Sequence, residues 1–200
     1  MFKKLFRYWQ NKTLFSKITD ILFIGLIIAF IFPSGRMAIG GSVNRIKAMI
    51  VQPGPEKARI SLPEPDLDWK LKDVNGLEMN MIEQKGKVKF INLWATWCPP
   101  CIGEMPEIEE LYNKFKDNEK ISFFMISDEE TEKLKEFTAR KNYTFPVYQS
   151  LSPNPTGLRS NSIPATYILS KNNEIVIKEI GAANWGSKKT EEIINELLKE

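Results

Sequence analysis

The chain has 200 residues, two cysteines and no histidine, and its 28 basic and 25 acidic residues give a formal net charge of +3. This composition excludes a structural zinc site, an iron–sulfur cluster with four cysteine ligands and a C-x-x-C-H haem attachment site. No metal or cofactor is therefore expected. The positive excess lies in residues 1–20, which hold five basic residues against one acid. The remainder is nearly neutral, so nucleic acid is not an expected partner.

The beginning of the chain predicts a single membrane anchor. A basic segment, residues 1–17, is followed by a run from Ile21 to Phe32 that is apolar apart from Gly25. With its flanking residues this run predicts an anchor over residues 18–35. The apolar run is shorter than the roughly 20 residues of a usual membrane span, and local thinning of the bilayer can accommodate the difference. The basic side is expected in the cytoplasm. The rest of the chain then lies on the periplasmic, extracytoplasmic side of a cell inner membrane.

A cleavable signal peptide is the competing interpretation, because Ala38 and Gly40 form a small-x-small pattern of the kind that precedes a cleavage site. Residues 36–65 otherwise predict a juxtamembrane segment and a proline-rich tether. Within them, Ser42 to Val51 has helical apolar spacing and fits either a short helix on the membrane surface or an ordinary linker. The four prolines between residues 53 and 65 favour an extended tether.

Residues 66–200 predict one α/β domain that begins with a β-hairpin extension and is long enough to bury a core. The hairpin joins residues 69–74 to 77–81 through Asn75-Gly76, a pair that suits a type I′ turn. Residues 150–162 have no predicted conformation. The other predicted elements are a buried strand over 87–94, a helix over 98–116, a buried strand over 121–127, a helix over 129–141, two strands after Pro164 joined by Asn172-Asn173, and a last helix from Ser187.

Both cysteines follow the first buried strand directly, in the order Trp97-Cys98-Pro99-Pro100-Cys101. With metal and haem excluded, the redox chemistry of one dithiol remains. If a helix begins at Cys98, its unpaired N–H groups and the positive end of its dipole stabilise the Cys98 thiolate, which makes Cys98 the predicted nucleophile. Cys101, one turn on and less exposed, is the predicted resolving thiol. The structural alternative is a pair of reduced cysteines in a buried helix, although Trp97, Pro99 and Pro100 are unusual residues for the interior of a buried helix.

The twelve residues from Phe90 to Cys101 resemble the strand-to-helix corner of the thioredoxin superfamily, and specifically its membrane-attached TlpA/ResA group of thiol-disulfide oxidoreductases. Pro106 falls where the active-site helix of this superfamily is kinked. Ile163-Pro164 matches the cis-proline loop that faces the disulfide and pairs with substrate backbone. The resemblance covers residues 67–200.

The resemblance implies a thioredoxin fold, with a central mixed β-sheet flanked by helices, and the reduction of disulfides in partner proteins. It also implies a membrane electron donor of the DsbD/CcdA type. Cytochrome c apoproteins, periplasmic thiol proteins and cell-surface proteins all fit as substrates. The implied substrate-contacting residues are Trp97, Pro99, Pro100, Ile163 and Pro164.

Proton handling has to differ from that of thioredoxin, because Asn92 stands where thioredoxin has a buried aspartate, and an amide cannot move a proton. Glu104 matches the acidic residue that the TlpA/ResA group places beside its cysteine pair. It lies one turn beyond Cys101, and burial would raise its pKa and suit it as a base for Cys101. A solvated glutamate on the helix surface is the alternative.

Two other functions stay open at this point. A tethered binding or chaperone module could keep the fold without turnover. A peroxidase of the peroxiredoxin type has a related fold, although the chain lacks the Pro-x-x-x-Thr-x-x-Cys pattern.

Overall fold

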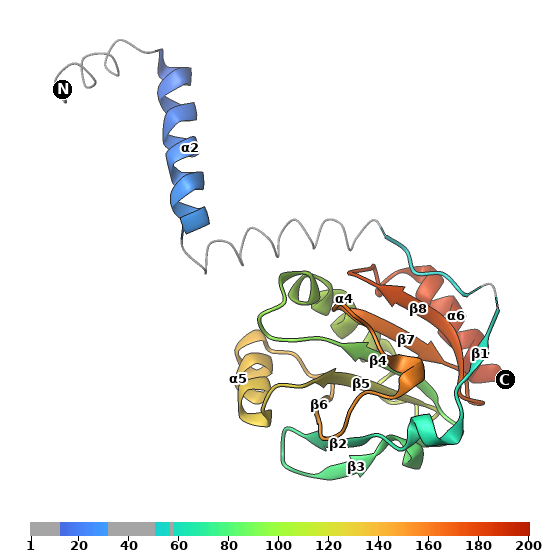
Figure 1. The fold of residues 1–200 in the computed structure, drawn as a ribbon. Coiled ribbons are helices and arrows are strands. Elements are labelled where there is room, and N and C mark those ends of the chain that lie inside the picture. The colour runs from blue at the N-terminus through green and yellow to red at the C-terminus, as the bar shows by residue number, and fades with distance from the viewer. Residues whose placement is uncertain (1–12, 32–50, 57) are drawn as a thin grey trace. The chain divides into compact units, whose positions relative to one another are not determined.

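The computed structural model describes residues 13–31, 51–56 and 58–200, which belong to two units that are considered separately (Figure 1). In the first unit, helix α2 runs from Leu14 to Ile31 and covers most of the predicted anchor. Over the described residues, no helix combines the length and the apolar character that crossing a membrane requires. The basic segment up to residue 12, the end of the anchor and most of the segment from Ser42 to Val51 lie outside the described residues.

The second unit is built on an eight-stranded sheet with the strand order β1-β8-β7-β4-β5-β6-β2-β3. The strands are β1 Ile60–Ser61, β2 Lys70–Asp73, β3 Glu78–Asn80, β4 Val88–Leu93, β5 Ile121–Ser127, β6 Val147–Ser150, β7 Ala165–Leu169 and β8 Glu174–Ile180. Strand β5 is parallel to both β4 and β6, and the other pairs are antiparallel. The sheet is therefore mixed, as predicted.

Three helices, α4 Pro99–Phe115, α5 Thr131–Lys141 and α6 Lys188–Lys199, pack against the sheet, and their buried apolar side chains all join one cluster (Figure 1). Short 3₁₀ turns lie at Glu64–Leu67, Met81–Gln84 and Thr156–Leu158. This is the thioredoxin fold with an added hairpin, and the predicted helix over 98–116 is confirmed almost to the residue.

Side chains alternate across the central strands, so each face of the sheet has its own apolar cluster. From β4, Val88 and Phe90 join the cluster that includes α4 and α6, while Ile91 and Leu93 join the cluster beneath the hairpin. Asn92 has the same parity as Phe90 and points toward α4. The pleat of one buried strand thus delivers a polar side chain to the underside of the helix that carries both cysteines.

Two local predictions are corrected. The hairpin turn is not type I′, because Gly76 has a positive φ of 88° but Asn75 does not, and type I′ needs both. The Asp73 carboxylate instead accepts the N–H groups of Asn75 and Leu77, each at 2.8 Å. Strand β6 was also absent from the predicted order; it is only four residues long and is defined by its neighbours β5 and β2.

Residues 51–56, placed by the sequence in the tether, lie against the domain. The Val51 carbonyl oxygen accepts the Asn184 N–H at 2.8 Å, and the Glu56 N–H donates to the Val176 carbonyl oxygen at 2.8 Å. Pro53 is buried. We call residues 51–56 the N-terminal strap.

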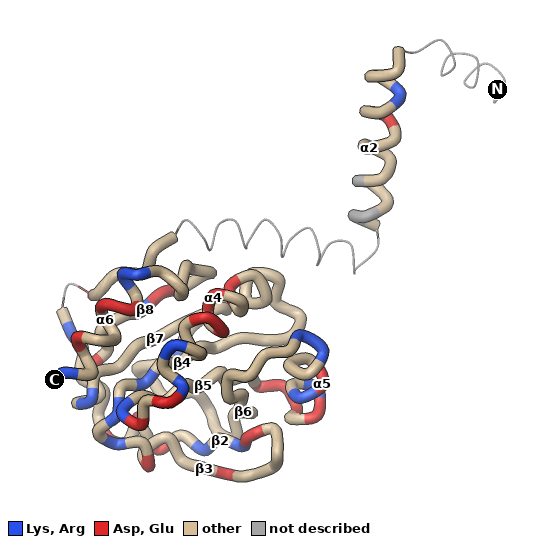
Figure 2. The backbone as a smooth tube through the Cα atoms, turned by 180° about the vertical axis from the view of Figure 1, so that it is seen from behind, with Lys and Arg blue, Asp and Glu red and all other residues tan. Residues whose placement is uncertain are grey.

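In the second unit, acidic and basic residues are interspersed along the backbone (Figure 2).

Candidate active site

The cysteine pair lies where β4 ends and α4 begins. Cys98 is the N-cap of α4, and it forms a disulfide with Cys101 across a Cα–Cα distance of 5.3 Å. Cys98 is only 3% exposed and Cys101 is fully buried. Cys101 is thus the less exposed of the two cysteines, as predicted, and Cys98 is also nearly covered in this oxidised state.

The first turn of α4 offers a single N–H group to sulfur. Pro99 and Pro100 occupy the first two helical positions and have no N–H. The Cys101 N–H donates to Cys98 Sγ at 3.3 Å, and the Ile102 N–H donates to the Cys98 carbonyl oxygen at 3.1 Å. The predicted support of Cys98 by the helix start is present, but the two prolines limit it to one direct donor and the helix dipole.

The loop before β7 faces the Cys98 sulfur. The Ile163–Pro164 peptide bond is cis, as predicted, and the Ile163 carbonyl oxygen lies 3.8 Å from Cys98 Sγ. Pro164 is buried, whereas Trp97 is 60% exposed. A cavity of about 170 Å³ is lined in part by Trp97, Ile163 and Ser160, and so borders residues on two sides of Cys98 without including either cysteine. Pro99 and Pro100 are half-buried at the edge of this region.

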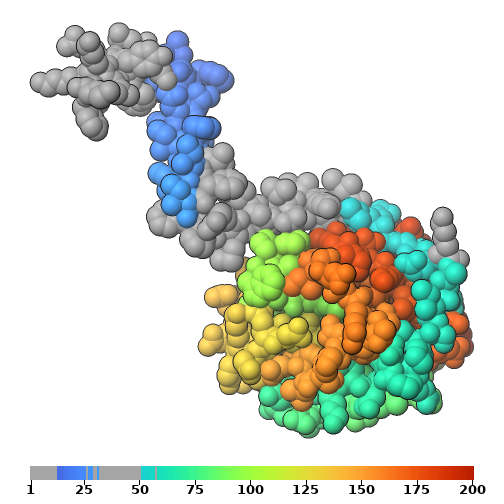
Figure 3. All heavy atoms as spheres, in the orientation of Figure 1, coloured from blue at the N-terminus to red at the C-terminus, as the bar shows by residue number. Residues whose placement is uncertain are grey.

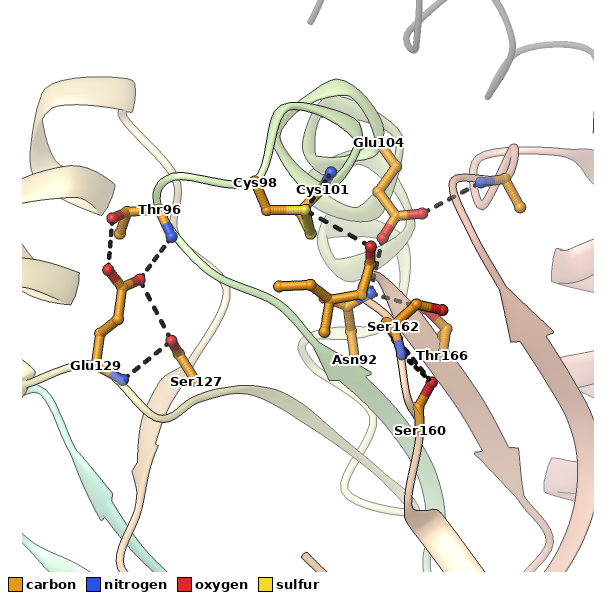
Figure 4. Close-up of a disulfide and its surroundings, with 12 residues drawn as sticks. Asn92, Thr96, Cys98, Cys101, Glu104, Ser127, Glu129, Ser160, Ser162 and Thr166 are labelled. Atoms are coloured by element: carbon orange, nitrogen blue, oxygen red, sulfur yellow. Dashed lines mark hydrogen bonds between the residues drawn. A yellow bond between two sulfur atoms is a disulfide. The ribbon is translucent and has the colours of Figure 1, made fainter. Parts of the chain in front are cut away.

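Glu104 is completely buried beneath the cysteine pair. It lies one turn after Cys101 on α4, so both side chains project from the same side of the helix (Figure 4). Its Oε1 accepts a hydrogen bond from Asn92 Nδ2 at 2.8 Å. Its Oε2 accepts two more, from the Ala183 N–H at 3.2 Å and from Trp185 Nε1 at 3.0 Å. The alternative of a solvated surface glutamate is excluded by this burial.

Burial raises the pKa of Glu104 to about 7, and the hydrogen bonds from Trp185, Asn92 and Ala183 limit the rise because they favour the carboxylate. The Glu179 carboxylate raises the pKa of Glu104 by a smaller amount. The predicted burial and raised pKa are thus confirmed. A group with a pKa near 7 holds a proton and releases it at neutral pH, as proton transfer requires.

Asn92 joins Glu104 to the sheet. Its Nδ2 also donates to Thr166 Oγ1 on β7 at 2.7 Å, while its Oδ1 is buried without a hydrogen-bond partner among the described residues. The amide therefore uses both donors and neither acceptor site. Rotation of the amide by half a turn would offer Oδ1 to Glu104 instead, which suits a protonated carboxyl group.

A second carboxylate, Glu129, holds the loop that leads to Cys98. It accepts the Thr96 N–H at 2.6 Å, the Thr96 hydroxyl at 2.9 Å and the Ser127 hydroxyl at 3.4 Å (Figure 4). It also forms an ion pair with Lys133. Burial raises the pKa of Glu129, but the bonds from Lys133 and Thr96 outweigh this and leave the pKa below its usual value. Glu129 is therefore a carboxylate that fixes the loop.

The structure brings every predicted site residue to one end of the sheet, around the disulfide. Sequence reasoning missed three contributors: Trp185, Thr166 and Glu129. Trp185 follows the last strand without a motif, and Thr166 is one residue of an apolar strand. The acidic run after β5 is the only signal that could have indicated Glu129, and a run of acids usually marks a solvated turn.

Comparison with known proteins gives one consistent result. A model of the Redoxin family matches residues 61–198. The thiol-disulfide oxidoreductase ResA of a Bacillus cereus strain is 32% identical over 127 residues, which cover 63% of this chain and 72% of that protein. The thioredoxin-like protein YneN of Bacillus subtilis is 32% identical over 127 residues, covering 62% of this chain and 74% of that protein.

A solved structure supports the fold. The thiol:disulfide interchange protein of the thioredoxin family from Chlorobium tepidum TLS superposes with a TM-score of 0.54 and 20% identity, covering 74% of this chain and 97% of that chain. At this identity the likeness establishes the architecture alone.

The Glu129 cluster yields a prediction about stability. Glu129→Gln removes a carboxylate that accepts two bonds from Thr96, so we expect a loss of about 1–2 kcal/mol in the free energy of unfolding. Glu130→Gln is the matched control, because Glu130 is exposed and its side chain makes no capping bond to α5. Urea unfolding of both variants measures the difference. Equal stability of the two variants would contradict the role given to Glu129.

Proposed function

This chain belongs to the Redoxin family and is a thiol-disulfide oxidoreductase with the thioredoxin fold, and we propose that it reduces disulfides in partner proteins from an extracytoplasmic position on a membrane. The observation that carries the mechanism is the completely buried Glu104, one helical turn from Cys101. Glu104 provides a proton acceptor for Cys101, the less accessible thiol, at a place that solvent does not reach.

The proposed reaction has two exchange steps. The Cys98 thiolate of the reduced enzyme attacks one sulfur of a substrate disulfide, a mixed disulfide forms, and the other substrate sulfur leaves as a thiolate and takes a proton. Glu104 then accepts the Cys101 proton, and the Cys101 thiolate attacks Cys98 Sγ. This releases the first substrate sulfur as a thiolate, which takes a proton from solvent, and leaves the Cys98–Cys101 disulfide, so two electrons pass from enzyme to substrate.

The start of α4 supports the reducing direction. A thiol-disulfide enzyme becomes more oxidising when its reduced form is stabilised, which happens when the nucleophilic thiolate is well supported. Here Pro99 and Pro100 remove two of the N–H groups that could support it, and only the Cys101 N–H reaches Cys98 Sγ. Weak thiolate stabilisation favours a dithiol that gives its electrons away.

The cavity lined by Trp97 and Ile163 supports a protein substrate. At about 170 Å³ it is smaller than the roughly 300 Å³ or more of a small-molecule site, and a side chain of a protein substrate is a more suitable occupant. The exposed Trp97 ring provides an apolar flank. The backbone next to Pro164 would pair with the substrate strand, as the superfamily resemblance implies.

Exposed apolar side chains on α2 support the membrane position. Leu22, Phe23 and Ile24 are 67%, 64% and 57% exposed, and consecutive helical residues point in directions about 100° apart. Apolar surface on all sides of a helix needs a covering, and lipid provides it. In the proposed arrangement the anchor retains the domain beside a membrane electron donor of the DsbD/CcdA type, which reduces the disulfide after each turnover.

The nucleophile is identified by trapping. Cys101→Ser should accumulate a mixed disulfide with insulin, used as a model disulfide protein, because the attack by Cys98 still occurs and resolution does not. Cys98→Ser should accumulate little. Non-reducing gel analysis after acid quenching measures both. Stronger trapping by Cys98→Ser would reverse the two roles, and absence of turnover by the wild-type chain would favour a binding module.

The role of Glu104 is read from a pH profile. Glu104→Gln should keep the fold, since the new amide can donate to Asn92 Oδ1 after rotation of Asn92. We expect resolution of the mixed disulfide to slow by about 10²-fold, a typical contribution of a general base. The difference in resolution rate between the wild type and the variant should be largest just above the Glu104 pKa of about 7, and it should shrink at higher pH, where Cys101 ionises without a base. Rapid-quench kinetics test this, and identical wild-type and variant profiles would exclude the role.

Membrane attachment is tested by fractionation. The chain should remain with membranes after a high-salt wash, and Ile24→Lys should weaken this retention because a charge within the apolar run is costly in lipid. Recovery of a soluble form that begins near Gly41 would instead identify the segment as a cleaved signal peptide.

A further inference from the structure

A short segment, Ala183 to Trp185, connects Glu104 to the N-terminal strap. The Ala183 N–H and Trp185 Nε1 both donate to Glu104 Oε2, at 3.2 and 3.0 Å. The N–H of the residue between them, Asn184, donates to the Val51 carbonyl oxygen at 2.8 Å. Successive N–H groups of the same segment therefore bond to two different parts of the molecule. A displacement of the segment at one contact moves the other contact as well.

The strap itself is well anchored. Pro53 is buried, Val51 packs against the apolar cluster that contains Trp185, and the Glu56 N–H bonds to β8. Figure 3 shows cyan atoms from the first described residues of the second unit against the red C-terminal part. The contact is a docked piece of chain with its own backbone hydrogen bonds.

The Trp185 ring has little freedom to move. It is fully buried and meets the Phe90 ring edge-on, with a centroid distance of 5.3 Å and an interplanar angle of 89°. An indole held in this way presents its only polar atom in one direction. Its N–H group therefore acts as a fixed donor to the Glu104 carboxylate.

The charged groups that face Glu104 are few. On α4 the neighbouring cysteines are joined in a disulfide and do not titrate. Glu179 on β8 acts on Glu104, and Glu56 in the strap acts in turn on Glu179. Asn92 and the 183–185 segment contribute neutral donors only. Since Glu179 is the charged group shown to act on Glu104 in the described part of the chain, and its effect is the smallest, the ionisation of Glu104 depends mainly on burial and on the three N–H donors.

We propose that Trp185 is a positioning residue for Glu104, and that the N-terminal strap, by holding Asn184, keeps the 183–185 segment where it supports the carboxylate. The residues that lead from the anchor to the domain are then part of the support of the active site. The inference rests on the proposed role of Glu104, but it concerns an ionisation equilibrium that is measured without turnover.

The first test removes one donor. Trp185→Phe keeps the ring and deletes the N–H, so the carboxylate loses support and the Glu104 titration midpoint should rise by roughly one pH unit. The measurement is the ¹³C carboxyl shift of Glu104 against pH in the oxidised full-length chain. Trp69→Phe is the matched control, because Trp69 is also fully buried and its Nε1 donates to Ser150 Oγ at 2.8 Å. It should leave the midpoint in place.

The second test loosens the strap. Val51→Asn puts a polar side chain into the half-buried site of Val51, whereas Gln52→Asn changes the exposed neighbour. We expect an upward shift for Val51→Asn that is smaller than that for Trp185→Phe, and none for Gln52→Asn. In the double variant, Val51→Asn with Trp185→Phe, the shift of the Glu104 midpoint should be smaller than the sum of the two single-variant shifts, because both substitutions act through the same segment.

Clear outcomes would overturn the proposal. A folded Trp185→Phe chain with the wild-type midpoint would exclude the positioning role, and a wild-type midpoint in Val51→Asn would exclude the strap. If Trp185→Phe failed to fold, the comparison of Val51→Asn with Gln52→Asn would decide. Wild-type kinetics in Glu104→Gln would exclude the proposed catalytic role of Glu104 and leave these titration shifts unaffected, so the two failures are distinguishable.

Discussion

The burial of one carboxylate against three N–H donors constrains the whole active site. Glu104 comes from α4, and its donors come from β4 and from the segment after β8. Without all three elements in place, the carboxylate would be buried with unmet hydrogen-bonding needs, at a cost of several kcal/mol. The same contacts that satisfy it therefore fix the helix that carries the cysteines relative to the sheet.

Two opposing influences meet at the dithiol. The start of α4 stabilises a Cys98 thiolate, but Pro99 and Pro100 reduce that support to one N–H group. Below the pair, burial raises the pKa of Glu104 to about 7, so that it accepts a proton where water has no access. Modest activation of the attacking thiol and local proton acceptance for the resolving thiol together suit a reductant.

Local sequence signals predicted most of the fold and the centre of the site. Cys98 as a helix start, the cis bond before Pro164 and the burial of Glu104 depend on motifs that neighbouring residues carry. Trp185, Glu129 and the docking of Val51 were not predictable in this way, because each depends on contacts between residues far apart in the chain. Strand β6 was missed for the same reason, since its pairing with β5 and β2 defines it more than its four residues do.

The central claim is that Glu104 takes the proton of Cys101 during resolution of the mixed disulfide. Reaction-induced infrared difference spectroscopy tests it most directly, with the carboxyl carbons of glutamate isotopically labelled and the reduced chain mixed with a disulfide substrate above neutral pH. A band of a protonated, buried carboxyl group should appear as the mixed disulfide resolves and be absent in Glu104→Gln. Resolution at the same rate without any change in carboxyl protonation would contradict the claim.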